Sequence, residues 1–330
     1  MTKAGASRAA NRPVPWPALR SGLLALVFFC GAMPLLAAGS STRVGATDRP
    51  FRLAFSSRMF TEVKVEDARA AMKVWLITIM RERSVPVDPE LKIYDSFEEM
   101  LRASKDSQIE GFGITTEEYW RLSKEIKFDR LIVAINNGRM TDEYVILVHR
   151  SSSIESIADL RGRGLIVLEH PRMSLAMVWL DTFLLQKGMN FSAKFFNRVM
   201  VVNKLSQAVL PVFFRKSDAC LVTRRGYETM SELNPQVDKQ LRVLAVSPEV
   251  VPSLFAFRAD HISSAREQMV AEMGKLPDSP AGQQILTLLQ TDRIEERPMS
   301  SLEDTLELLS TYHQLCSVAG GAKGKAAAPR

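Results

Sequence analysis

Short apolar runs separated by amphipathic segments recur along this chain of 330 residues. The runs have the length of buried strands and cover residues 51–55, 92–94, 108–112, 131–136, 144–149, 165–168, 198–202, 219–222, 241–247 and 255–258. Between several of them, apolar residues recur every three or four positions, as at Ala68, Met72 and Trp75 in the helix predicted over 65–83. This alternation predicts an α/β fold with a mostly parallel sheet.

The last long segment, residues 263–315, is predicted to be entirely helical. Three helix starts are expected in it: Ser264-Ala265-Arg266-Glu267, Ser279-Pro280 with proline in the first turn, and Ser300 or Ser301. Beyond residue 316 the chain is rich in Ala, Gly and Lys, which predicts a flexible tail over 317–330. The core of the final helix is expected at Leu302, Leu306, Leu309 and Tyr312.

The segment 158–187 carries the most chemical information. A glycine-broken turn, Asp159 to Gly164, leads into the strand 165–168, and a helix is predicted to begin again near Arg172 or Met173. A strand that runs into a helix start presents unpaired backbone N–H groups and the positive end of the helix dipole, which suits an anion. The candidate contacts in this loop are Glu169, His170, Arg172 and Ser174.

Three other strand ends carry polar residues. Because ligands of open α/β sheets bind beyond the carboxyl ends of the strands, these loops are expected to face one cleft. Thr115 with Glu118 also forms a capping box that needs no ligand, and the serines have an equal claim as ordinary turn residues. Of the adjacent arginines at 224 and 225, at least one is expected to be solvated. The candidates are Ser56, Ser57, Thr115, Thr116, Tyr119, Thr223 and Arg224.

The turn Asp159-Leu160-Arg161-Gly162-Arg163, with the strand and Ser174 that follow, resembles the PhnD-type periplasmic phosphonate- and phosphate-binding proteins, the substrate-binding components of ABC importers. The loop departs from that family at residues 171–173, where a further Ser or Thr is expected. The resemblance implies a type II periplasmic binding protein fold, with two α/β lobes, a cleft between them and two crossover strands. It also implies that residues 115–119 border the ligand and that the last helix packs on the first lobe.

The resemblance and the ends of the chain together give the expected domains. A basic segment followed by the apolar stretch 23–36 and Ala37-Ala38 predicts a signal peptide over residues 1–38, with retention as an anchor as the alternative. Lobe 1 is expected to comprise 39–142 and 246–316, and lobe 2 to comprise 143–245. The body is nearly neutral, because the basic ends of the chain account for the net charge of +6. A nucleic-acid partner is therefore not expected.

Several kinds of catalytic site are absent from the sequence. No P-loop, G-x-S-x-G elbow, dinucleotide fingerprint or Cys/His metal spacing is present, so we expect no enzyme and no cofactor. Glu169 with His170 comes nearest to an acid and base pair, and ligand contact or a structural hydrogen bond is favoured for it. Of the cysteines beyond the signal segment, Cys220 and Cys316, a buried free thiol at Cys220 is favoured over a disulfide.

The predicted function follows from the resemblance. A monomeric periplasmic protein is expected to capture a small anion of the phosphonate, phosphate or phosphite class by closing its two lobes, and to deliver it to an ABC permease. The same fold also serves in sensing, where a membrane receptor reads the lobe angle. The sequence does not separate these two functions.

Overall fold

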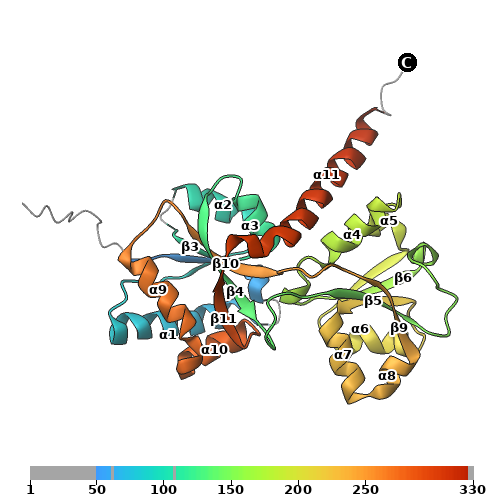
Figure 1. The fold of residues 1–330 in the computed structure, drawn as a ribbon, viewed down its shortest axis with the longest axis horizontal. Coiled ribbons are helices and arrows are strands. Elements are labelled where there is room, and N and C mark those ends of the chain that lie inside the picture. Colours follow the sequence, from blue (N-terminus) through green and yellow to red (C-terminus); the bar gives the residue numbers. More distant parts are fainter. Residues whose placement is uncertain (1–49, 61–62, 107–108, 326–330) are drawn as a thin grey trace, which may run out of the picture. The chain divides into compact units, whose positions relative to one another are not determined.

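The computed structural model describes residues 50–60, 63–106 and 109–325, whose strands form two sheets (Figure 1). The predicted signal peptide and the last residues of the predicted tail, 326–330, lie outside the described residues. The α/β architecture is confirmed. The expectation of a mostly parallel sheet is wrong, because the strands next to the crossings run antiparallel to their neighbours: the first sheet has two parallel and three antiparallel pairs, and the second has two of each.

The first sheet has six strands in the order β11-β4-β10-β3-β1-β2. Its strands are β1 (Leu53–Ser56), β2 (Lys92–Tyr94), β3 (Gly111–Thr115), β4 (Phe128–Ile135), β10 (Ser253–Arg258) and β11 (Arg293–Arg297). Pleating alternates the side chains of β1, so that Leu53 and Phe55 enter one hydrophobic cluster and Ala54 enters the cluster on the other face. The sheet is therefore covered on both faces.

Helices cover both faces of the first sheet (Figure 1). The Leu53 side carries α1 (Val65–Arg83), α9 (Ser264–Gly274), η4 (Leu276–Asp278) and α10 (Pro280–Leu288). The Ala54 side carries α2 (Phe97–Asp106) and α3 (Thr116–Leu122). A short 3-10 turn, η1 (Ser57–Phe60), follows β1 directly.

The second sheet has five strands in the order β7-β6-β8-β5-β9. Its elements are β5 (Tyr144–His149), η2 (Ile157–Leu160), β6 (Gly164–Leu168), η3 (Pro171–Met173), α4 (Ala176–Gln186), α5 (Ser192–Phe195), β7 (Arg198–Val202), α6 (Leu205–Phe213), β8 (Ala219–Thr223), α7 (Arg224–Leu233), α8 (Pro235–Gln240) and β9 (Leu241–Val246). The strands β6 and β8 are completely or almost completely buried, as their continuous apolar runs predict.

The turn at residues 159–163, which carries the family resemblance, needs a glycine at position 162 because of its backbone conformation. Gly162 adopts a φ of +71°, in the left-handed region that residues with a side chain seldom occupy. Its N–H donates to the carbonyl of Phe195 at 2.8 Å, and Asn197 N–H donates to the carbonyl of Arg163 at 3.0 Å. The turn therefore fixes how β6 begins beside β7.

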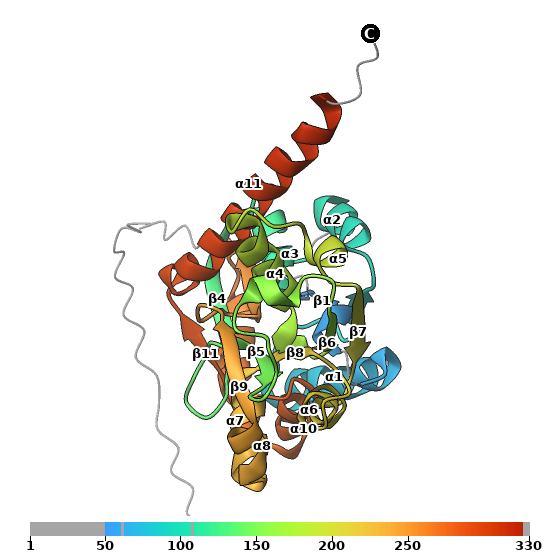
Figure 2. The ribbon, with the colours of Figure 1, turned by 90° about the vertical axis from the view of Figure 1, so that its right-hand side faces the viewer.

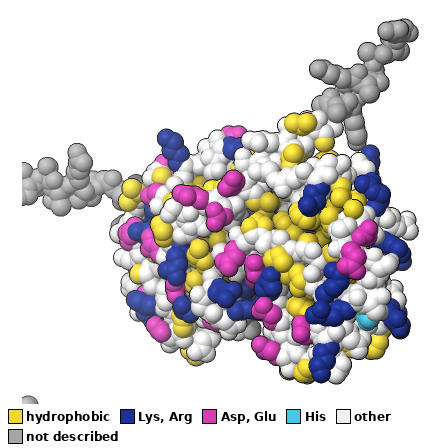
Figure 3. All heavy atoms as spheres, turned by 45° about the vertical axis from the view of Figure 1, so that its right-hand side comes forward, with side chains coloured by type: hydrophobic (Ala, Val, Ile, Leu, Met, Phe, Trp, Pro, Cys, Tyr) yellow, Lys and Arg dark blue, Asp and Glu magenta, His cyan; other side chains and the backbone are white. Residues whose placement is uncertain are grey.

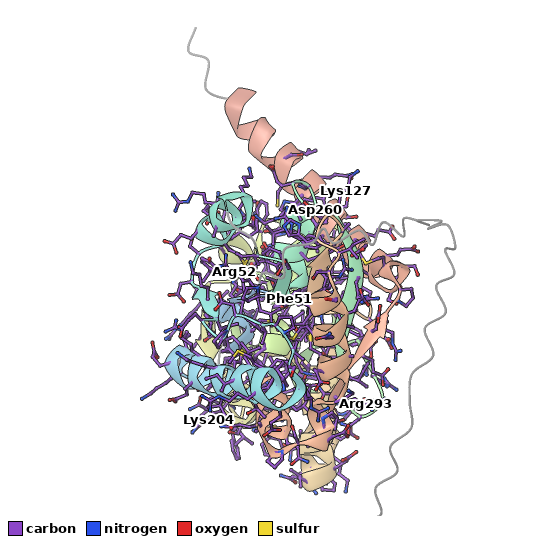
Figure 4. All side chains as sticks on the ribbon, turned by 90° about the vertical axis from the view of Figure 1, so that its left-hand side faces the viewer. Phe51, Arg52, Lys127, Lys204, Asp260 and Arg293 are labelled. Carbon is purple, nitrogen blue, oxygen red and sulfur yellow. The ribbon has the colours of Figure 1, made fainter. Side chains whose placement is uncertain are left out.

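The chain passes from the first sheet to the second between β4 and β5, and returns between β9 and β10. The two crossings are joined by a backbone bridge in which Asp142 and Val250 each donate an N–H to the other's carbonyl, at 2.8 and 2.9 Å. Figure 4 shows the two ends of the strand that leads into the first crossing. Lys127 and Asp260 lie at one end, where Phe128 pairs with Arg258, and Arg293 lies at the other, where it pairs with Ile135.

Two sequence predictions about elements were wrong. Residues 293–297 form the edge strand β11 inside the segment predicted to be entirely helical, because they pair antiparallel with the buried strand β4. The helix expected near Arg172 begins at Ala176 instead, since η3 and its following turn occupy the residues between. Tertiary pairing overrides local pattern in the first case, and Pro171 starts a separate short turn in the second.

The last helix, α11 (Glu303–Lys325), follows the turn η5 (Met299–Leu302) and packs beside both α3 and α4 (Figure 2). Leu302 lies in a cluster of the first sheet, and Leu309 lies fully buried in the cluster of the second. Leu306 contacts both clusters. The last helix was expected to pack on the first lobe, and it links the hydrophobic clusters of both sheets. It also continues through much of the segment predicted to be a flexible tail.

Candidate ligand-binding site

A cavity of about 400 Å³ lies at the carboxyl ends of β3 and β6 and is completed by η1, α4 and α11; we call it the main cavity. Its position agrees with the rule that ligands of α/β sheets bind beyond the carboxyl ends of the strands. The lining residues are Arg58, Thr115, Glu117, Val167, Leu168, Glu169, His170, Pro171, Met173, Ser174, Met177, Val178, Asp181, Val201 and Tyr312.

The hydroxyls at the ends of β1 and β3 converge on one buried carboxylate. Ser56 Oγ donates to Glu118 Oε1 at 2.8 Å, and Thr115 donates its Oγ1 hydroxyl and its backbone N–H to Glu118 Oε2, both at 2.9 Å. All three residues are buried. Ser56 Oγ also accepts from Arg58 N–H, and Thr115 Oγ1 from Glu118 N–H. The capping box is confirmed, and both hydroxyls donate and accept within the protein.

The other candidates on the first sheet lie away from the main cavity. Thr116 donates its hydroxyl to Val251 O, because α3 begins at this residue and turns its side chain toward the second crossing. Tyr119 packs on Phe128 with ring centroids 5.3 Å apart, and burial raises the pKa of its phenol. Ser57 begins η1 and is half-buried outside the lining. The structure places these three residues outside the lining of the main cavity.

The loop after β6 contributes three predicted residues to the main cavity, which are Glu169, His170 and Ser174. His170 caps η3, with its Nδ1 accepting the N–H of Arg172 at 3.1 Å. Ser174 Oγ donates to the carbonyl of Pro252 at 2.8 Å, which joins this loop to the second crossing. The hydroxyl keeps its acceptor capacity for a ligand.

Arg172 points away from the main cavity, although it belongs to the same loop. Its Nη1 lies 3.1 Å from Asp142 Oδ1 in the first crossing, and both side chains are largely buried. The hydroxyl of Tyr144 donates to the carbonyl of Arg172 at 2.9 Å. Burial raises the pKa of Asp142, although the charges of Arg172 and Arg225 oppose that shift. Arg172 therefore holds the loop to the crossing and is not placed to contact a ligand in the main cavity.

Thr223 and Arg224 also lie outside the main cavity. The strand β8 is antiparallel to β5 and pairs Thr223 with Tyr144, so its carboxyl end reaches the first crossing. Thr223 caps α7 by accepting Gly226 N–H at 3.1 Å, and Arg224 Nε lies 2.6 Å from Glu143 Oε2. Arg224 lines a separate, strongly polar cavity of about 300 Å³ beside that crossing. The expected single cleft for both loops is wrong.

We expect the substitution Thr223→Ala to lower the free energy of unfolding by about 1 kcal/mol, because it removes the cap of α7. Ligand affinity should be unchanged, since the residue does not line the main cavity. Urea unfolding and ligand titration of the same variant measure the two effects. A loss of affinity without a loss of stability would instead place the ligand at the end of β8.

The sequence alone did not single out several lining residues, of which Arg58, Glu117, Asp181 and Tyr312 carry polar groups. Asp181 lies one helical turn after Met177 on α4, and its Oδ1 accepts Ser192 N–H at 2.7 Å. Arg58 Nη1 lies 3.5 Å from Glu117 Oε2. Residues 174, 177, 178 and 181 recur every three or four positions, so the sequence could have placed them on one side of a helix. That this side lines a cavity follows from the packing of α11 against α4, which the sequence pattern does not show.

The face of the molecule drawn in Figure 3 carries acidic and basic side chains in mixture, with apolar side chains exposed between them. On that face no single sign of charge prevails.

Residues 50–60, 63–106 and 109–325 contain no cluster of His, Cys, Asp or Glu arranged for a metal ion. Within the same ranges, none of the helices is both long and apolar enough to cross a membrane. Cys220 and Cys316 are both free, and burial raises the pKa of the Cys220 thiol.

Two sheets joined by two crossings, with a cavity at the carboxyl ends of the strands, define a type II periplasmic binding fold. Residues 63–300 match the model of the family described as ABC transporter, phosphonate, periplasmic substrate-binding protein. The chain belongs to this family, whose members bind a small ligand outside the cytoplasm and work with an ABC permease. The predicted resemblance is therefore confirmed. No curated protein matches the chain.

Solved structures share the fold at low sequence identity. A binding protein component of an ABC phosphonate transporter from Pseudomonas aeruginosa aligns over 81% of this chain and 88% of its own, with 11% identity and a TM-score of 0.54. PhnD1 from Prochlorococcus marinus, in complex with methylphosphonate, aligns over 79% and 97%, with 13% identity and a TM-score of 0.51. A Xanthomonas citri protein bound to ATP aligns over 81% and 98%, with 14% identity and a TM-score of 0.58.

Proposed function

We propose that this protein captures a small ligand in the main cavity and delivers it to an ABC permease. The observation that carries the proposal is the composition of the cavity wall, to which β3 and η1 of the first sheet and β6 and α4 of the second both contribute. A ligand that touches both groups of elements stabilises the closed arrangement of the two sheets, because only that arrangement offers all of its contacts.

For the ligand, the family resemblance predicts a small anion of the phosphonate, phosphate or phosphite class. Ser174 and Arg58 support an anionic ligand, since a hydroxyl and a guanidinium of the lining face the same space. In this proposal the protein acts as a periplasmic monomer without catalysis. Lobe 1 comprises 39–142 and 246–316, and lobe 2 comprises 143–245.

Delivery is tested with an ABC permease and its ATPase subunits from the same organism, reconstituted in vesicles. We expect ATP hydrolysis to rise when the ligand-loaded protein is added, and to rise less with the ligand-free protein. The matched variant is Ser174→Ala, which removes a hydroxyl of the cavity lining and its hydrogen bond to the carbonyl of Pro252, and which should weaken the stimulation by weakening ligand binding. No stimulation, together with a response from a neighbouring receptor kinase or cyclase, would contradict delivery and favour a sensing role.

A further inference from the structure

A second concave site of about 190 Å³ lies on the second sheet, at the end away from the crossings; we call it the outer pocket. The strand β5 begins at the first crossing and ends at His149, and β6 and β8 run antiparallel to it. The end of β5 and the beginnings of β6 and β8 therefore share the outer edge of this sheet (Figure 1). The lining of the pocket includes His149, Arg215, Lys216, Ser217 and Asp218.

Two cations of the outer pocket keep their charge unpaired. The side chains of Arg215 and Lys216 form no hydrogen bond or ion pair with any residue that the structure describes. The acidic residue of the lining, Asp218, is already engaged. Its Oδ2 accepts the N–H of Gly164 at 2.9 Å, and its Oδ1 lies 3.6 Å from Arg163 Nη1. The charge that the pocket offers to a partner is therefore positive.

Arg215 occupies a backbone position that ordinarily belongs to glycine. Its φ is +56°, and it ends the turn after α6, where Lys216 donates its N–H to the carbonyl of Pro211 at 2.7 Å. A left-handed residue after a helix is usually glycine, because a side chain is strained there. A cation is favourable at a helix carboxyl end, but Lys216 supplies one without a positive φ. An arginine at a strained position beside a pocket points to a role for its side chain.

The surface around the outer pocket is also basic. Arg150 follows β5, Arg163 precedes β6 and Arg198 begins β7, so all three lie at this edge of the sheet. On the loop between β5 and β6, Glu155 is paired with Arg242, whose Nη2 lies 3.3 Å from its carboxylate. A positive field of this kind attracts anionic partners, and added salt weakens it.

The unused donors of the outer pocket suit a phosphate group. A guanidinium can bind two phosphate oxygens at once, and an ammonium adds a further charge-assisted hydrogen bond. Ser217 brings a hydroxyl that is likewise unpaired among the described residues.

An exposed aromatic ring lies beside these donors in the chain. The side chain of Phe214, which precedes Arg215, is 61% exposed and lies edge-on to Phe213, with ring centroids 5.0 Å apart. A combination of basic side chains with an exposed aromatic ring is typical of protein surfaces that meet an anionic bilayer. The chemistry of this edge therefore favours a phosphate group that is presented by a lipid.

We infer that the outer pocket and Phe214 form a docking site for an anionic phospholipid surface, with Arg215, Lys216 and Ser217 on the phosphate of a headgroup. This contact goes beyond the proposed function, because it needs no ligand in the main cavity. The main cavity lies at the other end of β6 and stays accessible. Docking would keep the protein at the membrane surface, where a permease lies.

The test measures cosedimentation of the purified protein with vesicles. Phosphatidylglycerol vesicles should bind the protein, and phosphatidylcholine vesicles, which carry no net charge, should not. The double substitution Arg215→Gln with Lys216→Gln should weaken binding to phosphatidylglycerol roughly 10-fold to 30-fold, because each basic side chain contributes to attraction by an anionic bilayer. The matched control, Arg69→Gln with Arg81→Gln, removes two exposed cations from α1 and should leave binding unchanged.

The substitution Arg215→Gly separates a binding role from a structural one. Glycine suits the left-handed backbone at this position, so the melting temperature should stay the same or rise. Binding to phosphatidylglycerol vesicles should nevertheless fall roughly 5-fold. Unchanged vesicle binding by this variant would overturn the role given to Arg215.

Three results would overturn the inference. The first is failure of wild type to bind phosphatidylglycerol vesicles, and the second is equal weakening by the α1 control, which would show attraction by net charge alone. The third is binding of inorganic phosphate in titration calorimetry that the double substitution abolishes, without vesicle binding, because the outer pocket would then take a soluble anion. None of them bears on capture in the main cavity, which Ser174→Ala tests separately.

Discussion

Substitution of Arg172 by methionine should lower the free energy of unfolding by about 3 to 5 kcal/mol, as expected when a buried carboxylate loses its partner. Asp142 is 5% exposed and lies 3.1 Å from the Arg172 guanidinium. Its second oxygen, Oδ2, is buried without a hydrogen bond among the described residues. Without the guanidinium, a buried negative charge would remain in the crossing that connects the sheets. Urea unfolding at neutral pH measures the loss.

The loss should also depend on pH. Burial already raises the pKa of Asp142, and removal of Arg172 raises it further in the folded state. A raised folded-state pKa gives stability that is present below the unfolded value and is lost as pH rises through the folded one. The deficit of Arg172→Met against wild type should therefore be smaller at pH 5 than at pH 7.5.

A double variant identifies the cause of the Arg172 effect. In Asp142→Asn with Arg172→Met, the uncompensated charge is gone, and most of the lost stability should return. If the double variant is as unstable as Arg172→Met, then lost packing of the arginine side chain, and not the buried charge, explains the result.

Substitution of Leu309 by alanine should cost about 2 to 5 kcal/mol, because it opens a hole in a closely packed cluster. Leu309 is fully buried where α11 meets the elements of the second sheet. Thermal and urea unfolding measure the loss. The matched control is Leu233→Ala on α7, where the side chain is 83% exposed and the same substitution should change stability by less than about 0.5 kcal/mol.

The same variant tests the role of α11 as a link between the clusters. Because Leu302 anchors the start of this segment among the residues of the first sheet, a loosened Leu309 should also weaken the hold of α11 on α4. Hydrogen exchange in α4 should then increase. A stability loss with unchanged exchange in α4 would show that α11 does not couple the two groups of elements.

Much of the fold could be predicted from the sequence because local pattern and tertiary position agree there. The apolar run 219–222 is buried in the second sheet as expected, and Gly162 marks the left-handed turn of the family motif. Prediction failed where the secondary structure of a segment depends on its tertiary contacts. The charged segment 293–297 forms a strand because it pairs with β4 at the edge of the first sheet. Its own sequence pattern does not predict this pairing.

The candidate site shows the same division. Thr115, Glu169, His170 and Ser174, which the sequence places at or after strand ends, lie together in the lining of one cavity. Arg172 was misplaced because its partner Asp142 lies in a crossing 30 residues earlier. Tyr312 was expected in the core, and its place at the cavity follows from how α11 packs against α4.

The most direct test of the account is a thermal-shift comparison of wild type and Met177→Trp, a substitution that fills the main cavity from α4. Methylphosphonate, phosphate and phosphite should each be applied to both proteins. Ligand at about a hundred times its dissociation constant adds roughly 2.7 kcal/mol of stability, which gives a clear shift. We expect at least one of these anions to stabilise wild type and to have no effect on Met177→Trp. Equal stabilisation of both proteins would place the ligand outside the main cavity and contradict the account.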